Sequence, residues 1–135
     1  MTQENKDLLL QDLCGRLPYG VKMQKFNEQN VFVDLYAINL KNYTIDFYTY
    51  KGKSLIIANT SKLARSGILL YKPCLFPFSS MTPKQKAELS MLVVGVEDIF
   101  KSFLIEVEFY HKHHIDYRGL IPMGLAIDAT GLNIY

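Results

Sequence analysis

Hydrophobic residues near the start of the chain recur at the spacing of one helix face. Thr2 suits the N-cap position of such a helix, and Gly15 and Pro18 favour its ending. The pattern therefore predicts a helix that begins after Thr2 and buries one apolar stripe. The stripe consists of Leu9, Leu10, Leu13, Cys14 and Leu17.

The period changes to two over residues 21–58, which is typical of half-buried strands. Polar turns at 27–30, 39–42 and 51–53 separate the runs, and strands joined by short turns indicate an antiparallel meander. A polar stretch at 59–67 is expected to form a loop. The predicted strands are Val21–Gln24, Val31–Ile38, Tyr43–Tyr50 and Ser54–Ala58, with Ile68–Tyr71 as a fifth strand or a buried connector.

Two prolines, Pro73 and Pro77, interrupt the apolar segment at 72–78. Because proline cannot donate a backbone hydrogen bond, this segment is not expected to be a central strand. It should run extended, with its apolar side chains packed on the body.

The clearest local signal is Thr82-Pro83-Lys84-Gln85, which matches a helix capping box. This helix should break near Gly95, and a second helix should follow from about Glu97 to Lys112. Residues 115–135 contain several glycines and a proline and should be irregular, with Leu125–Ile127 as a short edge strand. The second helix is expected to cover the sheet with Phe100, Phe103, Leu104 and Val107.

These elements together predict one α+β domain spanning residues 1–135. The expected architecture is an N-terminal helix, an antiparallel β-meander of about four to five strands, one or two helices on one face of the sheet, and an irregular C-terminal segment. Apolar residues make up 49% of the chain, which is enough for a core at this length.

Charge and composition narrow the function classes. The net charge of +2 is smaller than the basic excess of a dedicated nucleic-acid binder. It does not exclude a local patch of basic residues. The first residues lack the pattern of a signal peptide, and no apolar run approaches the ~20 residues of a membrane span. A cytoplasmic protein without membrane contact is therefore expected, with Cys14 and Cys74 as reduced, mostly buried thiols.

Side chains that could bind a metal or act in catalysis are concentrated at residues 111–118. Imidazole and carboxylate are ligands for zinc and other transition metals, and His111, His114 and Asp116 are the candidate ligands. On a helix, His111 and His114 could share a face. Histidine beside aspartate can also act in acid–base catalysis. The candidate catalytic residues are His113, His114, Asp116 and Arg118.

A structural role explains the same residues without catalysis. The histidines would then form a hydrogen-bonded helix terminus that fixes the final segment. Arg118 would pair with Asp116 or Asp128, or alternatively clamp an anion. No nucleotide-binding loop, dinucleotide fingerprint or nucleophile elbow is present, so no cofactor is expected, with a transition metal such as zinc as the alternative.

Aromatic residues on the predicted sheet could stack nucleic-acid bases. Aspartates share their faces and basic residues are few, so ordinary cross-strand packing is the preferred interpretation. The aromatic residues are Phe32, Tyr36, Tyr48 and Tyr50.

Three segments resemble a family of small uncharacterised proteins of gut-bacterial genomes, phages and prophages. They are Leu13-Cys14-Gly15-Arg16-Leu17-Pro18-Tyr19-Gly20-Val21-Lys22, Lys72-Pro73-Cys74-Leu75-Phe76-Pro77-Phe78-Ser79-Ser80-Met81-Thr82, and His113-His114-Ile115-Asp116-Tyr117-Arg118-Gly119-Leu120-Ile121 with Gly124-Leu125-Ala126. The resemblance implies a phage or mobile-element context and no particular activity. A basic residue often stands in that family where this chain has Phe76, so a partner contact made by that charge would be absent here.

Three functional hypotheses follow. The leading one is a non-enzymatic accessory or protein-interaction module associated with a phage or mobile element, whose partner is another protein. The second is a metal-dependent or acid–base enzyme that uses His111, His114 and Asp116. The third is a weak nucleic-acid binder. A further alternative is a homodimer formed through a strand at the sheet edge, such as Val31–Ile38.

Overall fold

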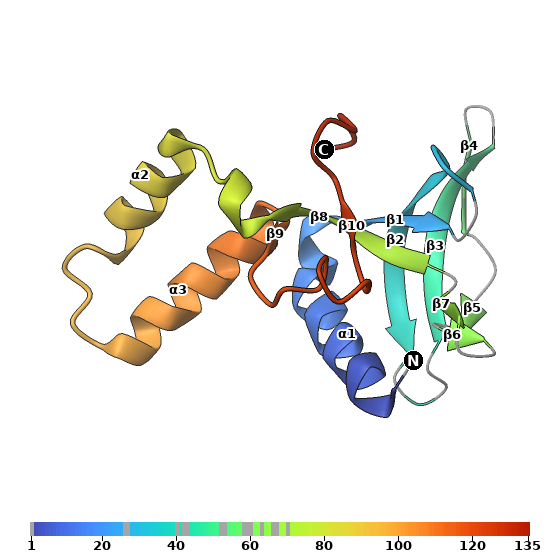
Figure 1. The fold of residues 1–135 in the computed structure, drawn as a ribbon, viewed down its shortest axis with the longest axis horizontal. Coiled ribbons are helices and arrows are strands. Elements are labelled where there is room, and N and C mark those ends of the chain that lie inside the picture. Colours follow the sequence, from blue (N-terminus) through green and yellow to red (C-terminus); the bar gives the residue numbers. More distant parts are fainter. Residues whose placement is uncertain are drawn as a thin grey trace.

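The computed structural model describes residues 2–25, 28–39, 41, 44–51, 54–57, 61–62, 64–65, 68–69 and 71–135. It has an α+β fold, as predicted (Figure 1). The helices are α1 (Gln3–Arg16), α2 (Pro83–Val93) and α3 (Ile99–Lys112), with short 3-10 turns at Leu17–Tyr19 and Phe78–Ser80. The strands are β1 (Lys22–Lys25), β2 (Phe32–Asn39), β3 (Thr44–Lys51), β4 (Ser54–Ile57), β5 (Ser61–Lys62), β6 (Ala64–Arg65), β7 (Ile68–Leu69), β8 (Tyr71–Pro77), β9 (Ile115–Asp116) and β10 (Ile127–Asp128).

Helix α1 begins where the sequence predicts. The Thr2 hydroxyl accepts a hydrogen bond from the Asn5 N–H at 3.1 Å, so it caps the first turn. Leu9, Leu10 and Leu13 of the predicted stripe are buried against the sheet, and Leu17 is half-buried. Cys14 is exposed, so the prediction of two buried thiols is wrong for this residue. It is turned roughly 100° around the helix from the buried Leu13.

The main sheet has the strand order β10-β8-β1-β2-β3-β4. Strands β1 to β4 pair antiparallel with their chain neighbours, which confirms the meander. Strands β9 and β10 pair parallel with β8, so the sheet is mixed and not wholly antiparallel. Strand β2 lies between β1 and β3, and residues 32–39 therefore do not form the sheet edge that a β2-mediated homodimer would need.

The segment predicted as a loop at 59–67 contains two short strands. Strand β5 pairs with β3, and β6 pairs with β7 in a separate two-stranded sheet. The loop prediction is wrong at these positions, because cross-strand contacts outweigh the weak preference of polar residues for loops. The rest of this stretch and parts of the three predicted turns lie outside the described residues.

Strand β8 occupies an interior position despite its two prolines, contrary to prediction. It uses different partners along its length. Residues 71–73 pair with β1, residues 74–75 pair with β10, and residues 76–77 pair with β9. Because no single partner runs along the whole strand, a missing N–H at Pro73 or Pro77 removes little from any one ladder.

Helices α2 and α3 form a hairpin, called here the helical hairpin (residues 83–112), that projects from the body (Figure 1). The predicted capping box is confirmed. The Thr82 hydroxyl accepts from the Gln85 N–H at 3.1 Å, and the Gln85 side-chain oxygen accepts from the Thr82 N–H at 3.0 Å. Helix α3 begins after Asp98, whose carboxylate accepts from the Phe100 N–H at 2.9 Å.

The helical hairpin does not cover the sheet, so that prediction is wrong. Phe100, Phe103 and Leu104 are exposed. The sheet face is already occupied by the leucines of α1 and by the segment around 120–126, which share one core with the strands. Helix α3 instead joins the body near its C-terminus, where Phe109 packs with Met81 and Ile115 in a second cluster.

The final segment ties the sheet together through Tyr135. Its hydroxyl donates to the Cys74 carbonyl at 2.7 Å and accepts from the Lys22 N–H at 2.9 Å. It therefore bridges β1 and β8 at the end of their ladder. The edge strand predicted at 125–127 is found slightly later, as β10 at residues 127–128.

Candidate functional site

Asp12 and Arg16, one turn apart on α1, form a fully buried ion pair. Arg16 Nε lies 2.7 Å from Asp12 Oδ2, and both side chains are 0% exposed. Arg16 Nη2 donates to the carbonyl of Ile115 at 2.7 Å. Removing either partner of such a pair leaves an uncompensated charge in the core, which typically costs about 3–5 kcal/mol. The pair thus fastens α1 to the segment that follows α3.

Tyr117 and Arg118 close over this pair. Arg118 Nε lies 3.3 Å from Asp12 Oδ1 and 3.2 Å from the Tyr117 hydroxyl. The guanidinium carbons of Arg16 and Arg118 lie 5.5 Å and 5.1 Å from the centre of the Tyr117 ring. Two cations near one aromatic ring gain cation–π attraction. The Asp12 carboxylate contacts both of them, Arg16 through Oδ2 and Arg118 through Oδ1.

The predicted ion-pair partners of Arg118 are wrong. Asp116 and Asp128 were expected, and the structure pairs Arg118 with Asp12 of the first helix. The Asp116 carboxylate instead accepts from the N–H groups of residues 120–121 at 2.8 Å and 2.9 Å, so it closes a turn. Local spacing could not reveal a partner that lies so far away in the sequence.

His111 packs directly on the backbone of α1. Its ring lies where a side chain at Gly15 would be, since a Cβ there would lie 2.5 Å from the His111 Cε1 atom. The ring is also fixed by a 2.9 Å hydrogen bond between Nε2 and the Tyr117 hydroxyl. Burial, and then the nearby Arg16 guanidinium, lower the pKa of His111, so the neutral ring is favoured.

His114 does not share a helix face with His111, contrary to prediction. Helix α3 ends at Lys112, and His114 has a left-handed backbone with φ 59°. Its ring stacks on Tyr135 at 3.7 Å and 14°. Burial lowers the pKa of His114 to about 4, with further lowering by nearby cations.

His113 faces a third direction, toward the helical hairpin. Its ring lies 4.3 Å from the Phe109 ring, and its Nε2 lies 3.9 Å from Glu88 Oε1. The three histidines therefore contact three different groups. Together they join α1, the end of α3 and the final segment.

Within the described part of the chain, no three His, Cys, Asp or Glu side chains converge as a metal site would require. The contacts that do form hold different secondary-structure elements together. The metal hypothesis for His111, His114 and Asp116 and the acid–base hypothesis for His113, His114, Asp116 and Arg118 stay predictions. The predicted aromatic face of the sheet is described only in part, because the side chains of Tyr48 and Tyr50 lie outside the described residues.

Sequence reasoning missed the centre of this cluster. The Asp12-x-x-x-Arg16 spacing was a readable signal, because residues four apart on a helix face one another. Both residues also fall on the same side of α1 as Leu9 and Leu13, which indicated burial. The role of Tyr135 had no comparable local signal.

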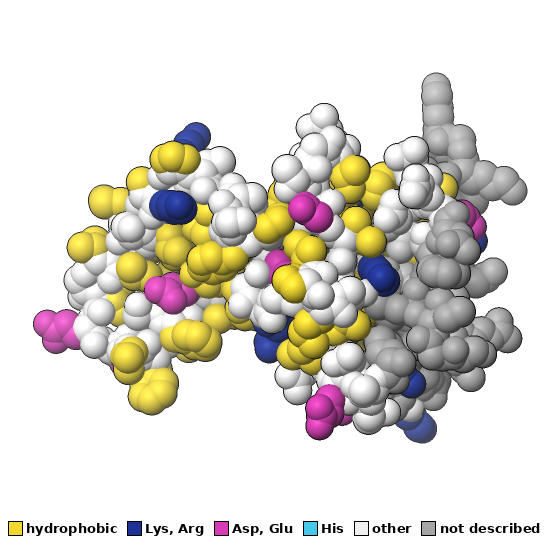
Figure 2. Space-filling view, in the orientation of Figure 1, with side chains coloured by type: hydrophobic (Ala, Val, Ile, Leu, Met, Phe, Trp, Pro, Cys, Tyr) yellow, Lys and Arg dark blue, Asp and Glu magenta, His cyan; other side chains and the backbone are white. Residues whose placement is uncertain are grey.

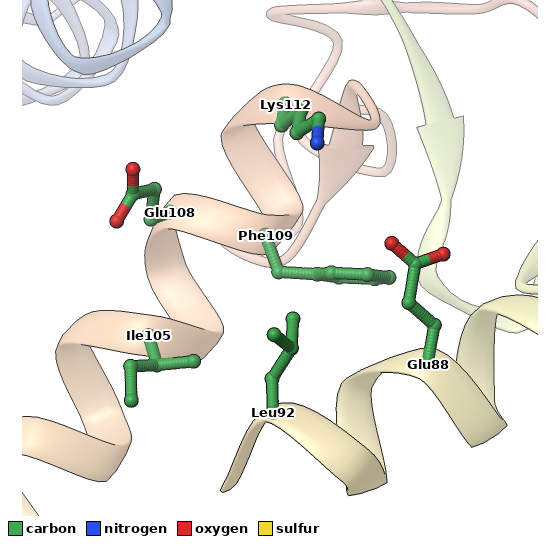
Figure 3. Close-up of a pocket in the computed structure, with 6 residues that line it drawn as sticks. All are labelled: Glu88, Leu92, Ile105, Glu108, Phe109 and Lys112. Atoms are coloured by element: carbon green, nitrogen blue, oxygen red, sulfur yellow. The ribbon is translucent and has the colours of Figure 1, made fainter.

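Helix α3 carries four large apolar side chains that are exposed and not buried in a core. Ile99 is 75% exposed, Phe100 79%, Phe103 60% and Leu104 66%. At 100° per residue these side chains fall on one face, called here the outer face of α3 (Ile99, Phe100, Phe103, Leu104). It points away from α2, because Ile105 and Phe109 point toward α2 (Figure 3).

The outer face continues a surface that the body covers further along α3. His111 lies within the same half of the helix circumference and packs against Gly15. The body thus covers the last turns of this face and leaves the first turns open. Figure 2 shows the resulting apolar side chains at the far end of the helical hairpin.

A groove of about 320 Å³ lies between α2 and α3. Leu92 and Phe109 approach each other across it, and the Glu88 carboxylate lies beside the Phe109 ring (Figure 3). The remaining lining residues are Ile105, Glu108 and Lys112. The groove has an apolar floor and a rim of both charge signs, and it borders the outer face through Glu108.

Helix α2 is described throughout and buries no residue. Met91 and Val94, near its C-terminal end, are also largely exposed. Among the described residues, no helix has the length and apolar character that a membrane crossing requires.

Comparison of the chain with protein-family models, with curated proteins and with solved structures found no match.

Proposed function

We propose that this protein is a non-enzymatic interaction module that docks on another protein through its helical hairpin. One observation carries the proposal: four large apolar side chains form the uncovered outer face of α3. Together they expose on the order of 500 Å² of apolar surface, near the upper end of what monomeric proteins tolerate. Contiguous surface of this kind typically marks an interaction site.

The structure of the body supports this role. The ion pair Asp12–Arg16 and the contact of His111 with Gly15 hold the base of α3 on α1. A fixed base keeps the outer face in one orientation, which reduces the entropy that docking would cost. The cluster first suspected of catalysis then serves binding, by positioning the helical hairpin.

The resemblance to proteins of gut-bacterial genomes, phages and prophages supports a more specific setting. In such a setting, an accessory protein without chemistry of its own can act by occupying a surface of another protein. We therefore include an accessory role encoded on a mobile element in the proposal.

Site-specific photo-crosslinking in the native cells tests the docking role. A photoreactive phenylalanine analogue at Phe100 should form a covalent adduct of defined mass with a protein. The same analogue at Val31, an exposed apolar residue of the body, is the matched control and should form none. Adducts at both positions alike, or no protein adduct at Phe100, would contradict the proposal.

A further inference from the structure

We infer that the protein which docks on the outer face of α3 is a second copy of this chain, bound as an antiparallel two-fold pair of α3 helices. This inference rests on the proposed function, because it assigns the occupant of the same surface. A two-fold interface must be self-complementary, since the same patch is used on both copies. The outer face of α3 meets that condition in charge and in area.

Charge complementarity comes from the flank of the outer face. Lys101, Leu104 and Glu108 lie along one edge of α3 at spacings of three and four residues. Lys101 and Glu108 are both exposed and stand on opposite sides of Leu104 along the helix. A two-fold axis near Leu104 therefore places Lys101 of each copy opposite Glu108 of the other, and this happens twice. A parallel arrangement would not pair these two positions.

The area is also of the right size. A standard protein interface buries about 800 Å² on each partner. The outer face contributes on the order of 500 Å² on each copy, so a pair buries roughly 1,000 Å² in total, which reaches the lower limit for a specific interface. In such a pair, the apolar side chains of each outer face are covered by the outer face of the other copy.

A lipid surface fits the same face poorly. Helices that lie on membranes carry an excess of lysine and arginine, which attracts anionic headgroups. Helix α3 has Lys101 and Lys112 against Glu106 and Glu108, and Glu97 and Asp98 directly precede it. These carboxylates would be repelled by an anionic bilayer.

Charge reversal provides the first test, with dimer dissociation measured by sedimentation equilibrium. Lys101→Glu and Glu108→Lys should each raise the dimer Kd by about tenfold or more, because each creates two like-charge contacts. The double variant should return the Kd to near that of the native chain. Glu108 also accepts a 3.1 Å hydrogen bond from the Tyr19 hydroxyl, so Tyr19→Phe is the control and should leave the Kd unchanged.

Cysteine crosslinking provides the second test and fixes the geometry. In a Cys14→Ser background, Leu104→Cys should form an intermolecular disulfide under mild oxidation, because the two-fold axis brings the two positions together. Met91→Cys, which is equally exposed but lies on α2, should form none. Rescue by the double charge variant and selective crosslinking at position 104 would establish the pair.

Three outcomes would overturn the inference, and they separate it from the proposed function. A native chain that stays monomeric at all concentrations, while Phe100 crosslinks to a different protein, would refute the second copy and leave docking intact. A Phe100 adduct with lipid alone would refute both. Dimers that are insensitive to Lys101→Glu and do not crosslink at position 104 would show that the copies meet elsewhere.

Discussion

At the scale of single residues, Gly15 shows how one missing side chain determines a contact between helices. Glycine inside a helix normally costs stability, because it has more backbone freedom to lose than alanine. Here its hydrogen atom leaves room for the His111 imidazole against α1. The glycine thus lowers the helix propensity of α1 but allows α1 and α3 to pack closely.

Replacing Gly15 with alanine should therefore destabilise the protein by about 1–3 kcal/mol, despite the higher helix propensity of alanine. The new Cβ would lie 2.5 Å from His111 Cε1, and the ring cannot move without losing its bond to Tyr117. Urea unfolding measures the change. Cys14→Ala on the exposed side of the same helix is the control and should shift stability by less than about 0.5 kcal/mol. An alanine variant as stable as the native chain would show that the helices do not meet at this distance.

His114 should make stability depend on pH in mild acid. The pKa of His114 is about 4 in the folded protein, against about 6.5 in the unfolded chain. Between these values the unfolded chain binds the proton and the folded protein does not. The contribution of the neutral His114 ring to the free energy of unfolding is therefore fully present above pH 6.5 and is lost as the pH falls toward 4. The charged groups that act on the ring after burial are Arg16, His113 and Lys22.

Thermal melting of the native chain and of His114→Asn at pH 7 and at pH 4.5 tests this expectation. Asparagine tolerates the left-handed backbone at φ 59°, so the variant removes the titrating ring without adding backbone strain. The drop in Tm between the two pH values should be smaller in the variant. Equal drops would place the acid sensitivity in the carboxylates instead.

At the scale of elements, α2 depends on its cap more than on its packing. It buries no residue, so burial of side chains contributes little to its stability. The reciprocal hydrogen bonds of Thr82 and Gln85 fix its first turn. Helix α3 differs, because Phe109 and His111 anchor its end in the body.

Thr82→Ala should consequently loosen α2 by about 1 kcal/mol while leaving the core intact. Hydrogen exchange should accelerate in the amides of residues 85–93 and stay unchanged in β1 and β2. Thr82→Ser keeps the hydroxyl acceptor and serves as the matched control. Uniform acceleration across the chain would mean that α2 unfolds only together with the body.

At the scale of the whole molecule, the locally encoded features were predictable. The alternation at 21–58 indicated the meander, and the Thr82 capping box indicated the start of α2, because each signal lies within a few residues. The parallel pairing of β8 with β9 and β10 joins distant segments and left no local trace. The same is true of the pairing between Arg118 and Asp12.

The outer face of α3 illustrates a different limit. An amphipathic pattern shows that a helix face avoids water, and it does not identify the surface that covers it. Phe100 and Leu104 therefore fitted a helix lying on the sheet as well as one that docks elsewhere. Only the position of α1 on the sheet decided between the two. The partners of the candidate residues at 111–118 did not follow from the sequence, because they lie on α1 and in the final segment.

The split partnership of β8 has a consequence for the order of folding. Its pairings with β1 and β10 join residues far apart in the chain, such as Met23 with Pro73 and Cys74 with Ile127. Each requires closure of a long loop, which slows formation, whereas the helical hairpin closes through near neighbours. The hairpin should thus be structured while the sheet is still incomplete. Because β9 and β10 follow the helical hairpin in the chain, a newly made chain would present its apolar helix before the sheet is complete, and crowding of such chains during synthesis would favour premature association.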